Sequence, residues 1–320
     1  MVFVQMNYSD LLLKTIARIA PGTELREGLE RIMRGRTGAL IVLGSDRTVS
    51  SLSSGGFNID TEFSATRLRE LAKMDGAIIC DRDATRLLHA GVQLMPDASI
   101  DTNESGTRHR TAERTAIQTG FPVISVSASM SMISVYVDGT RYTVEDSQYL
   151  MARANQAIQT LESYKKRLRS VLSSLSALEI ESNVSLADVA MTLQRMEMVN
   201  RIIREVSHYV LELGVHGRLI ALQLEELRAP EMTASDLILR DYLPETNDEL
   251  IAAGVEALQN LDDMAIVDLR TIARTVGFGE NPDLEFPLQP RGFRLLAGIP
   301  SIPNAISERL VERFGSLQAL

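Results

Sequence analysis

Runs of consecutive apolar residues alternate with amphipathic segments through the first 145 residues. Residues 39–43 and 76–80 are continuous apolar runs, which predict strands buried on both faces. Around these runs, residues 24–33 and 64–73 place apolar side chains at helical spacing. Strands that alternate with helices predict an α/β domain in which helices cover a mixed sheet, and we expect it to span residues 1–145.

Turn and stop residues organise the rest of this domain. Residues 112–119 are helical in pattern and end at Gly120, a typical helix terminator. Residues 123–127 and 132–137 are predicted strands, and Asp138-Gly139 beyond them indicates a hairpin. Residues 53–58 are rich in serine and glycine, so we expect them to form a loop.

Beyond residue 145 the pattern becomes that of long helices. One apolar stripe recurs at spacings of three, four and seven, formed by Leu150, Ala154, Ile158, Leu161, Leu168, Leu172 and Leu175. Ser185 and Asp188 have capping-box spacing and open a second helix, which Gly214 interrupts. We therefore expect an all-α spine over residues 146–286, with the stripes forming its core.

The last segment, residues 287–320, is short and locally basic. Arg291, Arg294, Arg309 and Arg313 outnumber two glutamates there. Short helices joined by glycine and proline turns suit backbone contacts to phosphates at helix N-termini. A small helical dimerisation piece fits the same pattern, and the residues alone leave both readings open.

Composition narrows the class of protein. The 320 residues are 45% hydrophobic and 23% charged with a net charge of −9, so only a local patch could contact nucleic acid. The single cysteine, Cys80, forms no internal disulfide and supports no cysteine-based zinc site. The N-terminal residues do not resemble a secretion signal, and no run approaches the ~18 apolar residues of a membrane span. We expect a cytoplasmic protein without a membrane partner.

The common catalytic motifs are missing. The sequence contains no G-x-x-x-x-G-K-[ST], no G-x-G-x-x-G after a strand, no G-x-S-x-G and no H-E-x-x-H. These absences exclude most P-loop enzymes, dinucleotide enzymes and serine hydrolases. Two other clusters of polar residues remain as candidate sites.

The first cluster is Asp75-Gly76-Ala77, between a predicted helix and a predicted strand. Glycine there allows a ligand to approach the backbone, and the carboxylate could bind a divalent cation or accept a proton. A plain turn before a strand remains an equally good interpretation of these three residues.

The second cluster is Ser105-Gly106-Thr107-Arg108-His109-Arg110-Thr111, which leads into the helix predicted at 112–119. Two guanidinium groups, hydroxyls and a helix N-terminus together provide fork-shaped donors and a positive dipole end. This combination favours a polyphosphate ligand; a solvated basic turn is the alternative.

These two clusters closely resemble the DGA and RHR motifs of diadenylate cyclases. Asp75-Gly76-Ala77 matches the first motif, and residues 106–114, GTRHRTAER, match the second. The three-part layout resembles the branch known as the DNA integrity scanning protein family, over the whole chain. This resemblance implies a cyclase domain, a helical spine and, over residues 287–320, a partial helix-hairpin-helix DNA-binding domain. The resemblance implies an enzyme that condenses two ATP into cyclic di-AMP with release of two pyrophosphates, using Mg²⁺ or Mn²⁺.

The resemblance also implies the role of each site residue. Asp75 would bind the metal and assist loss of the attacking 3′-hydroxyl proton. Gly76 and Ala77 would lie against the nucleotide, and Leu94 would touch the adenine. The phosphates would be held by Thr107, Arg108, His109, Arg110 and Thr111. The family further implies a homo-octamer with cyclase domains face to face, and binding of branched or damaged DNA through the C-terminal segment.

The chain departs from the family pattern at two places. Many members carry an arginine pair after the strand that follows Phe121-Pro122, where this chain has Ser127-Ala128-Ser129-Met130. The family's hairpin domain also continues into a second, glycine-rich hairpin, so residues up to Leu320 are expected to supply half of a DNA-binding unit. The missing arginines favour an alternative, a non-catalytic nucleotide-sensing DNA-binding scaffold. Asp75 together with Arg108 and Arg110 favours the enzyme.

Overall fold

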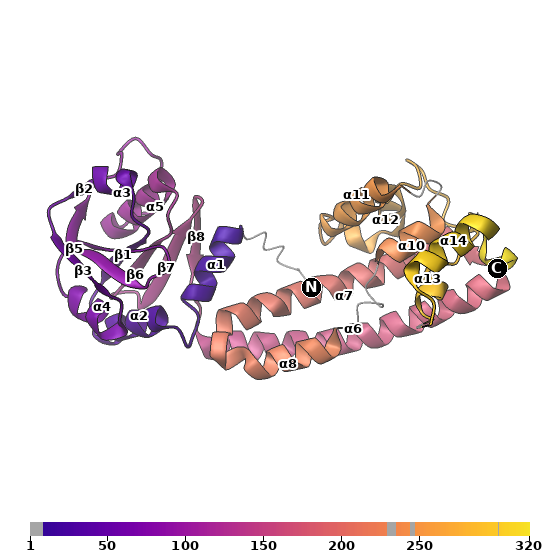
Figure 1. The fold of residues 1–320 in the computed structure, drawn as a ribbon, viewed down its shortest axis with the longest axis horizontal. Helices are drawn as coiled ribbons and strands as arrows, with labels where there is room; N and C mark the ends of the chain where they lie inside the picture. The colour runs from indigo at the N-terminus through magenta and orange to yellow at the C-terminus, as the bar shows by residue number, and fades with distance from the viewer. Residues whose placement is uncertain (1–8, 229–234, 244–246, 300) are drawn as a thin grey trace. The chain divides into compact units, whose positions relative to one another are not determined.

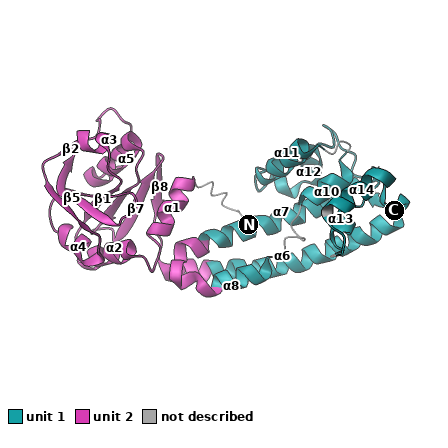
Figure 2. Ribbon diagram, in the orientation of Figure 1, with its two compact units in different colours: residues 1–6, 154–208, 220–320 teal, residues 7–153, 209–219 magenta. Residues whose placement is uncertain are grey.

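A computed structural model describes residues 9–228, 235–243, 247–299 and 301–320 of the chain (Figure 1). The chain forms two compact units (Figure 2). Residues 7–153 and 209–219 form one, drawn in magenta and called here the sheet unit. Residues 154–208 and 220–320 belong to the other, drawn in teal and called the helical unit.

The sheet unit is built on a mixed sheet, as the sequence predicts. Within residues 9–153 the sheet has eight strands in the order β2-β5-β4-β1-β6-β7-β8, with β3 also paired to β5. β1 and β4 are parallel and the remaining pairs are antiparallel. The strands are β1 (Ala39–Leu43), β2 (Ser53–Ser54), β3 (Phe57–Glu62), β4 (Ala77–Cys80), β5 (Arg86–Leu94), β6 (Val123–Ser127), β7 (Met132–Val137) and β8 (Thr140–Thr143).

Helices cover both faces of this sheet and bury a separate core under each. One core joins the sheet to α1 (Asp10–Arg18), α2 (Glu24–Arg34) and α4 (Ala65–Leu71). The other core joins the opposite face to α3 (Arg47–Ser51) and α5 (Thr107–Thr119). The alternation of side chains along each strand therefore decides which residues lie beneath α5.

Two expectations for this unit are wrong in detail. Residues 53–58 are not a loop throughout, because β2 ends at Ser54 and β3 begins at Phe57, with only Gly55 and Gly56 between them. Both glycines have positive φ, 66° and 81°, which permits this tight connection. The helix expected at 112–119 begins five residues earlier, at Thr107. The basic cluster is thus the first turn of α5.

Residues 209–219, which lie far along the chain, complete the sheet unit. The Val215 amide donates to the Pro21 carbonyl at 3.0 Å, and its side chain fills the space where a Cβ on Gly22 would stand. Leu211 packs against the core that α1, α2 and α4 share. Burial raises the pKa of Glu212, whose carboxyl is hydrogen-bonded to the Tyr142 hydroxyl on β8.

The helical unit is dominated by two long helices, as the apolar stripes predict. These are α6 (Ser147–Glu181), whose first turns belong to the sheet unit, and α7 (Leu186–Leu213). The capping box that opens α7 forms: the Ser185 amide and hydroxyl both donate to Asp188 Oδ2, at 3.0 and 2.6 Å. α7 ends at Leu213, directly before Gly214.

Shorter elements complete the described part of the helical unit. They are α8 (Arg218–Leu227), which begins in the sheet unit, then β9 (Val184–Ser185) paired with β10 (Pro287–Leu288), α10 (Ser235–Tyr242), α11 (Asp248–Gln259), α12 (Leu269–Thr275), α13 (Phe293–Ala297) and α14 (Asn304–Phe314), with 3₁₀ turns at Ala265–Val267 and Leu317–Ala319. A further 3₁₀ turn, Gly214–Gly217, belongs to the sheet unit. In the ranges that the structure describes, no helix is long and apolar enough to cross a bilayer.

Buried charges attach the C-terminal segment to the helical unit. The Asp241 carboxylate accepts the backbone N–H groups of Gly292, Phe293 and Arg294 at 2.6–2.9 Å, and burial raises its pKa to about 6. The Arg294 guanidinium forms an ion pair with the buried Glu179 carboxylate of α6. Arg291 donates to a backbone carbonyl at 2.8 Å. Two of the four arginines counted from the sequence are therefore engaged internally.

Candidate functional site

Three neighbouring strands meet at one edge of the sheet, where the candidate residues gather. β1 pairs in parallel with β4, with Ile41 opposite Ile78, and antiparallel with β6 on its other side. If the two pairing patterns are extended to Gly38, the residue just before β1, Asp75 lies opposite Gly38 on the β4 side and Ser127 lies opposite it on the β6 side. The site is therefore centred on a glycine that the sequence analysis did not single out.

Asp75 reaches this edge because the next residue is glycine. Gly76 has a φ of +105°, and a Cβ there would stand 2.6–2.9 Å from backbone atoms of Gly91 and Val92. Only glycine fits between β4 and β5 at this point. The Asp75 carboxylate is exposed, and no hydrogen bond or ion pair joins it to another residue that the structure describes. It is therefore open to a ligand.

The two other residues predicted around Asp75 lie deeper. Ala77 and Leu94 are buried, and both belong to the core between the sheet and α5. Leu94 is the last residue of β5, one strand away from β4. The fold thus brings Leu94 to the same side of the sheet as the basic cluster, although it lies 19 positions after Asp75 in the sequence.

The N-terminus of α5 is suited to bind an anion. Its N-cap residue is Gly106, which has no side chain to accept a hydrogen bond, and its first turn contains no acidic residue. The first N–H groups of the helix, from Thr107 onward, therefore lack a side-chain cap, and the helix dipole adds positive potential there. Thr107 is exposed and Thr111, one turn later, is partly exposed.

The two arginines of this turn have different surroundings. The Arg108 guanidinium lies directly against Gly38, so that a methyl group built on Gly38 would overlap it. Arg108 is exposed and has no hydrogen-bond or ion-pair partner among the described residues. Arg110 instead donates to the carbonyl oxygens of Glu104 and Ser105, at 3.3 and 3.1 Å. Only Arg108 is thus fully available at the edge beside Asp75.

His109, between the two arginines, points inward. It is 7% exposed, and its Nδ1 lies 2.8 Å from the Tyr136 hydroxyl of β7. That hydroxyl donates to Glu104 at 2.9 Å, and Arg141 of β8 donates to the same carboxylate oxygen at 2.8 Å. Burial lowers the pKa of His109, an effect that the nearby Glu104 opposes. The sequence analysis did not find Glu104, Tyr136 or Arg141; the β7–β8 register pairs Tyr136 with Arg141, and tertiary contacts bring Glu104 to both.

The turn after β6 differs from the family pattern in its charge. Ser127 and Ser129 are linked by a hydrogen bond of 3.3 Å between their hydroxyls, and Met130 is 57% exposed. No cation stands at residues 127–131. The nearest cation in sequence beyond this turn, Arg141, contacts the Met132 sulfur at 3.7 Å while it pairs with Glu104.

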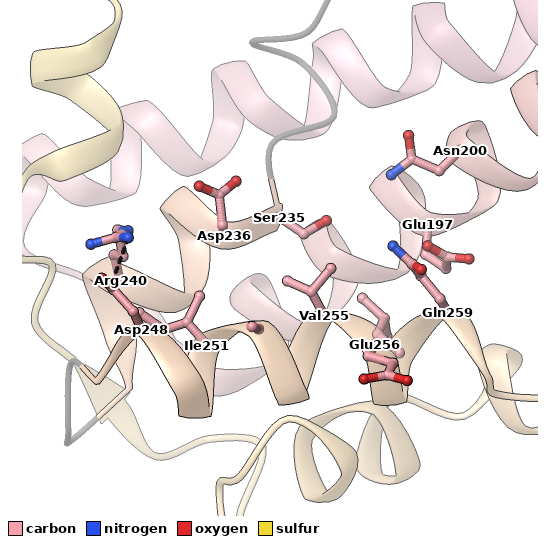
Figure 3. Close-up of a pocket in the computed structure, with 12 residues that line it drawn as sticks. Glu197, Asn200, Ser235, Asp236, Arg240, Asp248, Ile251, Val255, Glu256 and Gln259 are labelled. Atoms are coloured by element: carbon pink, nitrogen blue, oxygen red, sulfur yellow. Dashed lines mark hydrogen bonds and ion pairs between the residues drawn. The ribbon is translucent and has the colours of Figure 1, made fainter. Parts of the chain in front are cut away.

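A pocket in the helical unit contains none of these residues. It has a volume of about 530 Å³ and includes Asp236, Glu256 and the ion pair between Arg240 and Asp248, which are 2.7 Å apart (Figure 3). Its carboxylates outnumber its cations, so a polyphosphate would be repelled there. The edge of the sheet is the better candidate for a nucleotide.

An uncapped helix N-terminus, a free guanidinium and an open carboxylate at one sheet edge define an α/β nucleotide-binding domain. Comparison with known proteins agrees. The family described as "DisA bacterial checkpoint controller nucleotide-binding" matches residues 26–141, and "DisA bacterial checkpoint controller linker region" matches residues 144–285.

Similar proteins extend over nearly the whole chain. A Kineococcus radiotolerans protein, "DNA integrity scanning protein DisA", is 57% identical over 97% of this chain and 87% of its own length. Proteins with the same title from Acidothermus cellulolyticus and Streptomyces coelicolor are 57% and 53% identical, over 96% and 97% of this chain and 84% of their own lengths. The chain belongs to the DisA family. It is a nucleotidyltransferase of the diadenylate cyclase class.

Proposed function

We propose that this protein condenses two molecules of ATP into cyclic di-AMP and releases two pyrophosphates. One observation carries the proposal: Arg108, at the uncapped N-terminus of α5, rests on Gly38, the residue that the β1–β4 register, extended past the strand ends, sets opposite Asp75. A phosphate chain held at that N-terminus would lie within the same edge as a carboxylate able to act on a ribose hydroxyl.

The phosphates are assigned to the first turn of α5. Thr107 and Thr111 offer hydroxyls, the uncapped N–H groups offer donors, and Arg108 and Arg110 offer guanidinium groups. Negative charge grows on the α-phosphate and on the departing pyrophosphate during the reaction. Cationic and N–H donors already in place stabilise that charge without reorganisation. His109 belongs to the same turn.

Asp75 is assigned the proton and the metal ion. Each 3′-hydroxyl oxygen forms a bond to the α-phosphorus of the other nucleotide, the bond from that phosphorus to pyrophosphate breaks, and the hydroxyl proton leaves through Asp75. An exposed carboxylate without a protein partner fits Mg²⁺ or Mn²⁺, and the described residues hold no cluster of three or more potential ligands. A bound cation would supply charge neutralisation, with phosphate oxygens and water as its other ligands.

The nucleoside is assigned to the β4–β5 side of the edge. The backbone at Gly76 and Ala77 would lie against the nucleotide, and Leu94 would contact the adenine. Gly76 is exposed beside Asp75, which supports this assignment, while the space that a side chain there would need is taken by the backbone of β5. Leu94 and Ala77 share one apolar core, which suits a flat apolar base more than a phosphate.

The reaction requires two copies of the site. One edge has one carboxylate and one set of phosphate donors, so two ATP-loaded sites must face each other for two bonds to form. We therefore propose a homo-oligomer, an octamer as the family implies. We also propose a cytoplasmic location and a division into cyclase, spine and C-terminal DNA-binding regions at residues 1–145, 146–286 and 287–320.

Coupling to DNA is proposed through residues 287–320. Arg309 and Arg313 are exposed on α14, whereas Arg294 is paired with Glu179. Phosphate contacts of DNA would therefore fall to Arg309, Arg313 and the backbone N–H groups at the start of α14.

The test is the identity of the product. The full chain is incubated with ATP and Mg²⁺ or Mn²⁺, and the nucleotides are identified by mass spectrometry beside a sizing column. We expect cyclic di-AMP and pyrophosphate, and neither from Asp75→Asn, which should still bind ATP. Bound ATP without a cyclic product would refute the proposal in favour of the nucleotide-sensing scaffold. Full activity of Asp75→Asn would remove Asp75 from its role.

A further inference from the structure

A chain of hydrogen bonds runs beneath the first turn of α5, exposed at its Arg141 end and buried at its His109 end. It leads from Arg141 on β8 to Glu104, then to the Tyr136 hydroxyl on β7, and ends at His109 Nδ1. Tyr136 is 1% exposed and His109 is 7% exposed, while the Glu104 side chain is 13% exposed. Each of these groups is therefore largely removed from water, where a broken hydrogen bond is costly.

The direction of each bond follows from the chemistry of its partners. An ionised carboxylate only accepts, so the single Tyr136 hydroxyl proton goes to Glu104. His109 Nδ1 must then carry a proton and donate to the tyrosine oxygen. Burial lowers the pKa of His109 and favours its neutral form, in which Nε2 has no proton. A neutral His109 in this tautomer has no N–H left for a phosphate.

The loop before α5 is fastened along the helix by bonds that are independent of the network. Arg114 Nε donates to the Ile100 carbonyl at 2.8 Å, and the Asp97 amide donates to Gln118 Oε1 at 2.9 Å. Glu104, near the end of this loop, is bonded to Tyr136 on β7 and to Arg141 on β8. The network therefore adds polar contacts to β7 and β8 just before and within the first turn of α5, while Ala112 and Ala116 pack later turns of the helix on the sheet.

We infer that Glu104, Tyr136 and His109 form a positioning network, which holds the first turn of α5 so that Arg108 and Arg110 meet the nucleotide phosphates in one orientation. The inference rests on the proposed function, because it concerns the same phosphates. His109 does not bind the phosphates itself but fixes the position of the helix turn that carries Arg108 and Arg110. Arg141 neutralises the charge of the Glu104 carboxylate.

The experiment compares two buried tyrosines of the sheet unit. Tyr136→Phe removes the bridging hydroxyl and keeps the ring. Tyr142→Phe is the matched control, because Tyr142 is 8% exposed, is hydrogen-bonded to the Glu212 carboxyl, and faces the opposite core. For each full-length variant we would measure the melting temperature, the Kd for a non-hydrolysable ATP analogue by calorimetry, and the kcat and KM of cyclisation.

We expect both variants to melt at lower temperature by a similar amount, about 4 °C. Only Tyr136→Phe should raise the analogue Kd, by about tenfold, and lower kcat as well. Glu104→Gln keeps an oxygen for the Tyr136 hydroxyl and should stay within about threefold of wild type, whereas Glu104→Ala should behave like Tyr136→Phe.

The inference fails if Tyr136→Phe binds the analogue as wild type does, or if Tyr142→Phe weakens binding equally. Failure of the proposed function is a separate outcome. If the wild-type chain binds the analogue but makes no cyclic product, the reaction is wrong, and the Kd comparison still decides whether the network positions the arginines.

Discussion

Gly38 offers a direct test of the site, because no other residue type leaves room for the Arg108 guanidinium. Its φ lies outside the positive range, so Gly38→Ala is compatible with the backbone. The new methyl carbon would stand 2.6 Å from Arg108 Cζ, whereas carbon atoms pack at about 3.5–4.0 Å. The guanidinium must therefore move by about 1 Å.

We expect this movement to lower the rate of the reaction but to leave the stability of the fold almost unchanged. Arg108 is exposed and bonded to no other described residue, so its flexible end can move with little loss of stability. A misplacement of about 1 Å in a substrate-positioning group can cost up to ~100-fold in rate. We expect kcat/KM for cyclisation to fall by about 10- to 100-fold, which corresponds to about 1.4–2.7 kcal/mol of transition-state stabilisation.

The assay is steady-state formation of cyclic product by Gly38→Ala, with the melting temperature measured in parallel. In an Arg108→Ala background the methyl has nothing to displace, and we expect it to change kcat/KM by less than about twofold. A Gly38→Ala enzyme with wild-type kcat/KM would show that Arg108 does not act from its place on Gly38. A large additional loss in the Arg108→Ala background would show that the methyl acts by another route.

Three further predictions concern the helical unit. The pKa of Asp241 is raised to about 6, so the contribution of this carboxyl to the free energy of unfolding is complete below pH ~4 and is lost as the pH rises through 6. Between pH 5 and 7, chemical denaturation should show that the wild type loses about 1 kcal/mol of unfolding free energy relative to Asp241→Asn. Parallel pH curves for the two proteins would contradict this. Ser185→Ala should lower the unfolding free energy by about 1 kcal/mol, because the Asp188 capping box is lost; an unchanged urea midpoint would count against it. Replacing Arg309 and Arg313 with alanine should weaken DNA binding and reduce the slope of log K against log salt by about 2, and a salt-independent affinity would exclude a phosphate contact.

The sequence predicted the elements with strong local signals. β1, β6 and β7 occupy the residues expected, because each is a short run dominated by apolar and β-branched residues. The hairpin forms where Asp138-Gly139 stands, with φ values of 50° and 71° that suit a tight β-turn. In these cases the residues of the segment itself were sufficient to predict its secondary structure.

The sequence pattern did not predict the first turn of α5, because every residue in that turn is polar. Thr107 to Thr111 contain no apolar residue, so hydrophobic periodicity detects the helix only from Ala112. Tertiary contacts supply what periodicity cannot: His109 is buried against Tyr136, 27 positions away. β3 was missed for a similar reason, because its polar residues depend on pairing with β5.

Sequence motifs identified the residues of the site, but the sequence did not predict how these residues are arranged in space. Asp75 and Arg108 carry the motif, and the structure brings them to the same edge. Gly38 carries no motif, and its place between Asp75 and Ser127 depends on two strand registers that no local pattern encodes. The roles of the individual residues remain predictions for the experiments above.

The return of residues 209–219 to the sheet unit determines how the protein can be dissected. A fragment that stops at residue 145 would keep every strand of the sheet but lose two contacts made by residues 209–219. The core surface that Leu211 covers would be exposed to water, and the Tyr142 hydroxyl would lose its hydrogen bond to Glu212. Exposed apolar surface of this kind promotes self-association. A minimal catalytic fragment should therefore shorten α6 and α7 together and splice them with a short linker, so that the turn carrying Val215 still reaches Pro21.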